Sequence, residues 1–525
     1  MKIPFLLLAF CFWQFGISAQ KTAGGYVFED VNNNGKKDRN EKGIAKVAVS
    51  NGEDVVITDA KGKYQLPIGD DNIIFVIKPS GFKTPVDDKN LPVFHYNYKP
   101  SGSPRDLKYE GISPTGALPQ SIDFALVRNS EESDNFRFFA FGDPQVTNPQ
   151  EVDYFKRGIV DEVKTVKEIS FGISLGDAAN NNLDVFPLYR DAVAEMGIPW
   201  YNVKGNHDRN ADATDDKYGD ETFELFFGPA NYAFQYGKVH FFILDDIISP
   251  SPVKELDYIG GLRDDQFKFI ENYLKLTDKN DLLIFCVHIP VSFTPRSFGN
   301  ADRLRFFDLL KGHENVLMLS AHTHVQKQLF SEKTLGWDGE KPFHDFNVGT
   351  TNGNWYSGEF DNAGIPVSTM ADGTPKGYAI VNIEGNKYTF DYKVAGKPAD
   401  CVMNIYCPKV VPQMRHNPYA VYVNFFLGTG KDKVEYRIDG KIWKDMQPVE
   451  EYDPYFIYLS QRWDFSETLL QGRRPGLPSR CTHLWKGNIN TTLDTGEHQI
   501  EVRVTDMFGR THLEKTVYRI EKPFF

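Results

Sequence analysis

Metal-binding residue types recur in the middle of the chain, each time directly after a short apolar run. Carboxylate and amide oxygens and imidazole nitrogens suit Zn²⁺, Mn²⁺ or iron. A single aspartate at a strand end is usually a turn or helix-capping residue, and a single histidine is usually a satisfied polar group. Seven such residues after five successive runs are hard to explain by capping, so they predict a metal site. The seven are Asp143, Gln145, Asp177, Asn206, His288, His322 and His324.

The apolar runs alternate with stretches of helical periodicity from Phe136 to about Lys393. Helices are expected at about residues 152–168, 183–196, 264–276 and 302–311. This alternation indicates a layered α/β domain, and ligands of open α/β sheets bind at the carboxyl ends of the strands. The predicted elements therefore carry the seven side chains to one crevice.

The order and spacing of these motifs resemble the calcineurin-like metallophosphoesterases, a resemblance that covers Phe136–Lys393, about half of the chain. The family's pattern is Asp-x-His, Gly-Asp, Gly-Asn-His-Asp/Glu, His and Gly-His-x-His. Here Gln145 stands where many members have histidine, and Ala321 replaces a glycine. An amide oxygen is a weaker ligand than imidazole for borderline metals. An Asp-Pro-Gln form of the first motif also resembles a known branch of the family, so reaction class and fold are expected to be retained.

The resemblance implies a dinuclear centre of Mn, Zn or Fe ions that hydrolyses phosphoester bonds with a metal-bound hydroxide as nucleophile. Asp177 would bridge the two ions, since each carboxylate oxygen can hold one cation. His207, held by Asp208, would stabilise charge or protonate the leaving group. The ligands of one ion would be Asp143, Gln145 and His324, and those of the other Asn206, His288 and His322.

Four residues are weaker candidates for substrate contact. Arginine suits bidentate phosphate binding, and Trp or Tyr can stack on a sugar or base. An ordinary loop role is equally consistent with each of them. They are Arg296, Asn354, Trp355 and Tyr356. The sequence leaves open the substrate, the choice between monoester and diester, and the metal identity.

Short apolar runs separated by turn residues fill the chain between Gly24 and about Arg128, which predicts a small β-sandwich. A Pro- and Tyr-rich loop, 84–120, interrupts it. The segment resembles transthyretin-like and cell-surface B-domain modules of secreted bacterial proteins. Within this segment, residues 30–41 fit the twelve-residue EF-hand loop. Gly35 is at position six, and oxygen side chains would hold a structural Ca²⁺. These are Asp30, Asn32, Asn34, Asp38 and Glu41. A polar turn between two strands is the alternative.

From Val402 to Phe525 the pattern is again that of β-strands, one of them expected at Tyr455–Leu459, and we expect a second small sandwich. Cys401 and Cys407 could form a disulfide in an oxidising compartment, with Cys481 as a competitor. The sequence leaves the pairing and the oligomeric state open.

The chain begins with Met1-Lys2, the apolar run Ile3–Ile17 and Ser18-Ala19, the pattern of a secretory signal peptide cut after Ala19. The run is short for a spanning helix, and no other segment has that length. We therefore expect export to the periplasm or beyond, with no transmembrane segment in the mature chain. The net charge of −12 argues against general nucleic-acid binding.

The sequence thus predicts a layered α/β phosphoesterase core flanked by two small all-β sandwich domains. The expected ranges are 1–19 for the signal peptide, 20–130 for the first sandwich, 136–395 for the core and 400–525 for the second sandwich. The alternative function is a cell-surface binding or scaffold protein whose phosphoesterase core is vestigial.

Overall fold

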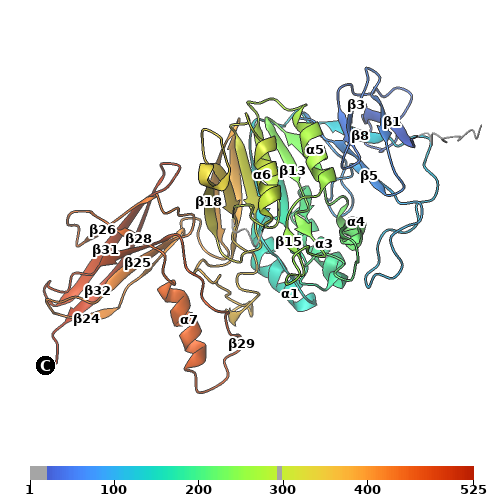
Figure 1. Cartoon of the computed structure of the whole chain (residues 1–525). Coiled ribbons are helices and arrows are strands. Elements are labelled where there is room, and N and C mark those ends of the chain that lie inside the picture. Colours follow the sequence, from blue (N-terminus) through green and yellow to red (C-terminus); the bar gives the residue numbers. More distant parts are fainter. Residues whose placement is uncertain (1–19, 293–297, 525) are drawn as a thin grey trace, which may run out of the picture.

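Three bodies follow one another along the chain, and the middle one is the largest (Figure 1). The computed structural model describes residues 20–292 and 298–524. The predicted signal peptide and Arg296 lie outside these residues. The expected layered α/β core between two β-rich domains is confirmed. Among the described residues, no helix is both long and apolar enough to cross a membrane.

The N-terminal domain is a sandwich of two four-stranded sheets. One sheet contains β4 (Lys63–Pro67), β1 (Thr22–Glu29), β8 (Phe124–Arg128) and β6 (Phe82–Lys83). The other contains β3 (Val55–Ile57), β2 (Ala48–Ser50), β5 (Asn72–Ile77) and β7 (His95–Tyr98). Strand β4 alternates exposed and buried residues, as expected for a strand with one face on a core. Strand β7 lies within the region expected to be a loop.

The core contains two facing sheets whose central strands are parallel. Strands β10 (Phe171–Leu175), β16 (Leu282–Cys286) and β17 (Val316–Ser320) are buried along their whole length, as expected for parallel strands covered on both faces. Phe138 and Phe171 of one sheet contact Phe241 of the other edge to face, with ring centroids 5.3 and 5.4 Å apart. Packing of these aromatic rings therefore joins the two sheets.

The first core sheet runs β11 (Trp200–Val203), β10 (Phe171–Leu175), β9 (Asn135–Phe141), β21 (Gly377–Glu384) and β22 (Lys387–Val394). The second runs β12 (Tyr232–Tyr236), β13 (Val239–Ile243), β16 (Leu282–Cys286), β17 (Val316–Ser320), β19 (Phe343–Asn347) and β18 (Lys327–Ser331). Two small ribbons pair β14 (Ile247–Ile248) with β15 (Ile259–Gly260), and β20 (Gly358–Glu359) with β29 (Gly472–Arg473).

Helices cover the outer faces of the two core sheets (Figure 1). The side chain of Asn148 begins α1 by accepting the backbone N–H groups of Gln150 and Glu151. The four predicted helices are confirmed, with shifted ends and with a π-helical turn inside the first. Their bounds are α1 (Pro149–Phe155), the turn Lys156–Val160, α2 (Asp161–Val163), α3 (Phe186–Ala194), α5 (Asp264–Leu274) and α6 (Asn300–Leu309); a further helix is α4 (Glu221–Phe227).

The C-terminal domain packs two sheets together but is not all-β. The strand expected at Tyr455–Leu459 is wrong, because these residues lie in helix α7 (Pro454–Asp464). Asp453 accepts the N–H of Phe456, and proline occupies the first turn, both of which favour a helix start. The sheets contain β23 (Met403–Tyr406), β25 (Ala420–Phe425), β30 (Leu484–Asn488) and β28 (Gln447–Val449), and β24 (Val410–Pro412), β32 (Thr511–Glu521), β31 (Gly496–Thr505), β26 (Lys433–Ile438) and β27 (Lys444–Asp445). The four described cysteines are unpaired.

A buried ion pair fixes the N-terminal domain on the core. Lys78 Nζ lies 3.2 Å from the carboxylate of Glu132, and both side chains are buried. The other oxygen of Glu132 accepts the N–H groups of Gly81 and Gly237, one from each domain. The backbone N–H of Gln235 in β12 donates to the carbonyl of Lys78. The polar segment 129–135, expected to be a linker, is therefore held between the two domains.

Replacing Lys78 with methionine should lower the free energy of unfolding by about 3–5 kcal/mol, because the Glu132 carboxylate would stay buried without its partner. Urea unfolding followed by circular dichroism measures the loss. Lys268→Met is the matched control, since it breaks an exposed ion pair with Glu53 between the same two bodies. The control should shift the urea midpoint little. Equal shifts for both variants would contradict a fixing role for the buried pair.

Candidate metal centre

The seven predicted ligands meet at the carboxyl edge of the two core sheets. Asp143 and Gln145 follow β9, Asp177 follows β10, and Asn206 follows β11. His288 follows β16 of the facing sheet, and His322 and His324 follow β17. Neighbouring parallel strands end side by side, so residues far apart in the sequence reach one point.

Strained backbone marks most of these positions. Asp143, Gln145, Asp177, His322 and His324 have positive φ angles of 39°, 43°, 52°, 71° and 52°. Non-glycine residues adopt this region at a cost, and such residues cluster at functional sites. The chain turns sharply after each strand, which directs the following side chain into the crevice.

Four acceptor atoms crowd together around the ring of His288. Its Nδ1 lies 2.8 Å from the carbonyl oxygen of Leu175 and so carries the ring hydrogen. In the neutral ring its Nε2 thus presents a lone pair, 3.0 Å from Asn206 Oδ1, 3.3 Å from Asp177 Oδ2 and 3.2 Å from His322 Nδ1. Lone pairs repel one another unless a cation lies between them. The donor set thus fits a metal ion, and the ligand atoms of Asp177, His288 and His322 lie within 4.8 Å of one another.

A second group of acceptors adjoins the first. Asp143 is fully buried, and its Oδ1 has no hydrogen-bond partner among the described residues. This oxygen lies 3.6 Å from Nε2 of His324, whose Nδ1 also lacks a partner there. Gln145 donates its amide to Asp177 Oδ2 over 3.1 Å. Turning this amide over exchanges its nitrogen and oxygen in the same space, so Gln145 can offer either atom. Unpaired buried oxygen and nitrogen atoms fit a second cation.

The protonation states agree with two cation sites. Burial raises the pKa of Asp143 to about 8, and burial lowers the pKa values of His322 and His324 to about 3 and 4. Burial opposes ionisation of His288, but Asp177 outweighs it and raises the pKa of this ring to about 10. A proton on Nε2 would thus hold the four acceptors together, and a metal ion would displace that proton.

Comparison with known families supports the same assignment. Three family models match the chain: the N terminal of Calcineurin-like phosphoesterase at residues 31–111, Calcineurin-like phosphoesterase at 136–326, and the C terminal of Calcineurin-like phosphoesterase at 345–512. The chain belongs to the calcineurin-like phosphoesterases. This is a hydrolase family with a dinuclear metal centre, and its central model spans all seven strand-end residues.

Two further proteins are similar to parts of the chain. Colossin-A of Dictyostelium discoideum is 48% identical over 66 residues, which are 12% of this calcineurin-like phosphoesterase and 1% of Colossin-A. The chain thus spans a very small part of that protein's length. Among solved structures, the purple acid phosphatase PPD1 of yellow lupin seeds is 13% identical, with 67% of each chain covered and a TM-score of 0.37.

The expected partner of His207 in this phosphoesterase is wrong. The carboxylate of Asp208 accepts the backbone N–H groups of Ala178, Ala179 and Gly205, and so it braces two of the motif loops instead. His207 Nδ1 lies 2.8 Å from Oδ1 of Asn181. Asn181 was missed although it follows the Gly-Asp motif by only four residues. A carboxylate next to a histidine in sequence can still point away from it.

Other residues missed by sequence reasoning surround the centre. Asp246 accepts the N–H groups of His288 and Ile289, and it lies in the short segment that follows β13. The guanidinium of Arg209 lies 5.1 Å from the ring of Tyr258, which in turn lies edge to face with His322 at 6.2 Å. The position of Arg209 directly after the Gly-Asn-His-Asp motif was the available signal.

The four proposed substrate contacts divide by burial. Trp355 is 39% exposed and stacks on His324, with ring centroids 4.0 Å apart. Tyr356 is buried and donates to the carbonyl of Pro144. Asn354 is also buried, and its Oδ1 accepts the N–H of Gly476. Asn354 and Tyr356 therefore hold the loop, which contradicts a substrate role for them, and Arg296 lies outside the described residues.

The C-terminal domain contacts the loop that carries His322 and His324. Oδ2 of Asp372 accepts the N–H of Gln326, two residues after His324, and lies 3.2 Å from Nε2 of His483. Asn424 donates to the carbonyl of Asp372 and to the carboxylate of Asp453. These residues are all buried. The C-terminal domain thus helps to position one edge of the metal centre.

Replacing His288 with glutamine should lower metal affinity by at least about tenfold, since loss even of a group that only supports a ligand costs about 10–100-fold. Metal content of purified protein, measured by mass spectrometry, reports the change. His344→Gln is the control, because His344 is buried in β19 against Tyr388 and Gln328, away from the centre. Normal metal content in His288→Gln, or equal loss in the control, would contradict the assigned site.

Proposed function

We propose that the protein hydrolyses phosphoesters with two transition metal ions, Mn, Zn or Fe, bound by the seven strand-end residues. The observation that carries this proposal is the crowding of acceptor atoms of Asn206, Asp177 and His322 around Nε2 of His288. Bound divalent ions supply positive charge for the phosphoryl oxygens and make a water acidic enough to attack. Asp177 adjoins ligands of both groups, which favours it as the bridging carboxylate.

We assign His207 to the leaving group. Its backbone N–H donates to Asp177 Oδ1, which places the residue beside the centre, and Asn181 holds its Nδ1. The hydrogen on Nδ1 leaves Nε2 as the atom that receives or gives a proton. Burial lowers the pKa of His207, and Asp177 partly opposes this effect. An anionic substrate next to the ring would favour its protonated form, so substrate binding would prepare the acid.

Arg209 is the proposed contact for the substrate's negative charge. Its Nε has no hydrogen-bond partner among the described residues although the atom is buried. Its Nη1 donates to Oγ of Ser249, which fixes the guanidinium beside Tyr258. A fixed guanidinium matches phosphate oxygens well. Trp355, exposed next to His324, is the proposed contact for the organic part of the substrate.

A second proposed cofactor is a structural Ca²⁺ in the N-terminal domain. Asp30 and Glu41 are buried carboxylates, and Gly35 has a φ of 70°, as position six of such a loop requires. The loop is drawn together by its own bonds: Asp30 accepts the N–H of Gly35, and Glu41 accepts those of Val31 and Asp38. Calcium would replace part of this network with oxygen ligands.

Export by the N-terminal leader is likewise a proposal, supported by the charged start, the apolar run Ile3–Ile17 and the small residues that follow it. A transition metal centre and a calcium loop are compatible with a periplasmic or extracellular protein. Western blotting of fractionated cells, with and without the leader, tests it.

Replacing His207 with alanine should reduce turnover by about 10²–10³-fold, because it removes a donor to the charge that develops in the transition state. The loss should be larger for an alkyl or phenyl phosphate than for p-nitrophenyl phosphate, whose leaving group needs no proton. Assays with Mn²⁺, Zn²⁺ and iron, on monoesters and diesters, measure it.

Metal content should stay normal in His207→Ala, and His313→Ala, a buried histidine outside the centre, should keep full turnover. A fall in metal content would make His207 a ligand. Wild-type protein that holds under one metal ion per chain and hydrolyses no ester would favour the vestigial alternative.

Glu41→Gln should weaken calcium binding by at least about tenfold, because the last position of the loop normally gives two carboxylate oxygens to the ion. Isothermal calorimetry on protein treated with EGTA measures the affinity. Asp88→Asn, an exposed carboxylate of the same domain, should bind calcium like the wild type. Absence of any heat of binding in the wild type would leave the loop as a polar turn.

A further inference from the structure

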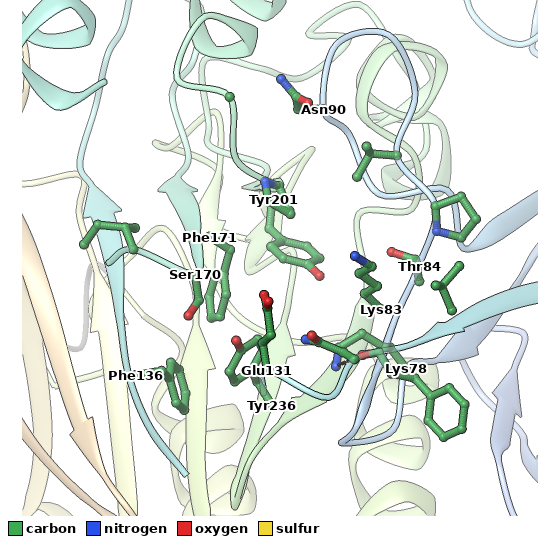
Figure 2. A pocket seen from close by; sticks show the side chains of 18 of the residues that line it. Lys78, Lys83, Thr84, Asn90, Glu131, Phe136, Ser170, Phe171, Tyr201 and Tyr236 are labelled. Carbon is green, nitrogen blue, oxygen red and sulfur yellow. Dashed lines mark hydrogen bonds between the residues drawn. The ribbon is translucent and has the colours of Figure 1, made fainter. Parts of the chain in front are cut away.

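A cavity of about 790 Å³ lies between the N-terminal domain and the core (Figure 2). Its core side is formed by residues at the beginning of β9, β10 and β11, including Phe136, Ser170 and Pro199. Its other side is formed by the segment Phe82–Val86 and by Asn90 of the N-terminal domain. The volume lies in the range of small-molecule sites, which are often found at domain interfaces.

This cavity is on the opposite edge of the sheet from the metal centre. Phe171 begins β10 and lines the cavity, whereas Asp177 follows the end of the same strand. A five-residue strand spans about 17 Å at its usual rise per residue. A ligand in the cavity therefore does not touch the reacting atoms.

The walls of the cavity are fixed in place. The segment that crosses between the domains carries Glu132, which binds Lys78 and the backbone of both domains. Asn90 donates from its side chain to the carbonyl of Ala194 in the core. Contacts on both sides of the cavity hold the two domains at a fixed distance. The cavity is therefore formed before a ligand binds, and binding would lose little conformational entropy.

Two hydroxyl groups in the cavity wall are unused. Tyr201 is only 7% exposed, and no hydrogen bond of its hydroxyl is found within residues 20–292 and 298–524. Figure 2 shows this hydroxyl directed into the cavity. Thr84, 8% exposed, also lines the cavity without a side-chain partner in the described chain. Both hydroxyls are thus free to form hydrogen bonds with a ligand in the cavity.

Charged side chains of both signs face the same space. Lys83, Glu131 and Glu168 line the cavity, and none of them has an ion pair with another described residue. In Figure 2 the ammonium of Lys83 and the carboxylate of Glu131 lie on either side of the Tyr201 hydroxyl. These charged groups provide strong donors on one wall and strong acceptors on the other.

Apolar rings complete the lining. Phe82 and Tyr236 are half-buried and form part of the wall. The ring of Tyr236 packs against Phe136 and Phe171, with ring centroids 4.4 and 5.5 Å apart, which holds it in place. Flat apolar surfaces next to hydroxyl, ammonium and carboxylate groups suit a ligand that is apolar on its ring faces and rich in hydroxyls at its edge.

We propose that this cavity binds a neutral saccharide. Sugar hydroxyls both donate and accept hydrogen bonds, so they can satisfy the free hydroxyls of Tyr201 and Thr84 and also pair with Lys83 and Glu131. The C–H faces of a pyranose ring fit the aromatic wall, and the hydroxyls of an uncharged sugar can bond charged groups of either sign. The phosphoesterase would then be held at, or regulated by, a glycan through a site separate from its metal centre.

The test uses the full-length mature protein and saturation-transfer NMR with glucose, galactose, mannose, N-acetylglucosamine and their common disaccharides. At least one sugar should bind to the wild type. Tyr201→Phe should weaken it by about tenfold, since it removes one hydrogen bond in a desolvated site. The ring of Tyr201 stacks on Phe234, with centroids 4.1 Å apart, so phenylalanine should keep the packing.

Lys83→Met and Glu131→Gln are independent variants, and because both residues are exposed they should fold normally and bind the sugar at least about tenfold more weakly. Tyr232→Phe is the matched control: its hydroxyl bonds the backbone of Asn202, outside the cavity, and it should bind like the wild type. The proposal would be overturned if no sugar bound at a concentration of about 10 mM, which is above typical weak affinities. Unchanged sugar binding in all three cavity variants would also overturn it. So would binding of glycine or phenylalanine in place of sugars.

Discussion

Repulsion between buried lone pairs is the constraint on which the centre of this structure depends. Asp143, Asp177, Asn206, His288 and His322 bring acceptor atoms together where water is excluded, and few hydrogens are available to separate them. Such an arrangement is stable only with positive charge inside it. The positive φ angles of the motif residues carry a further cost. Bound cations would offset both costs together, which would couple folding of the core to metal binding.

The sequence predicted the centre better than its supports. A ligand set is readable because each residue follows an apolar strand, and parallel strands end at one edge whatever the details of their packing. The supports depend on contacts between distant segments, which leave no local pattern. One example is the contact of His207 with Asn181, where Asp208 was expected. Another is the contact between Asp372 and His483. Helix α7 was missed because the aromatic residues of Tyr455–Leu459 suggested a strand, while the signal at Asp453 and Pro454 was overlooked.

The two outer domains act at opposite edges of the core. The N-terminal domain is fixed near the start of the parallel strands by Lys78 and Glu132 and encloses a cavity there. The C-terminal domain meets the loops that follow the strands, through Asp372 and the short β20–β29 ribbon. The core thus has the candidate metal centre at one edge of its sheets and the cavity at the opposite edge. The position of each domain, more than its own fold, decides which edge it influences.

The contact between Asp372 and His483 also has a consequence for synthesis. Strand β30, next to His483, is translated after the core strands that carry the predicted metal ligands. The loop after His324 gains this support only when the chain as far as β30 has left the ribosome. A nascent chain thus carries the predicted ligands before it can hold them firmly, which delays the finished centre until the C-terminal domain has been made.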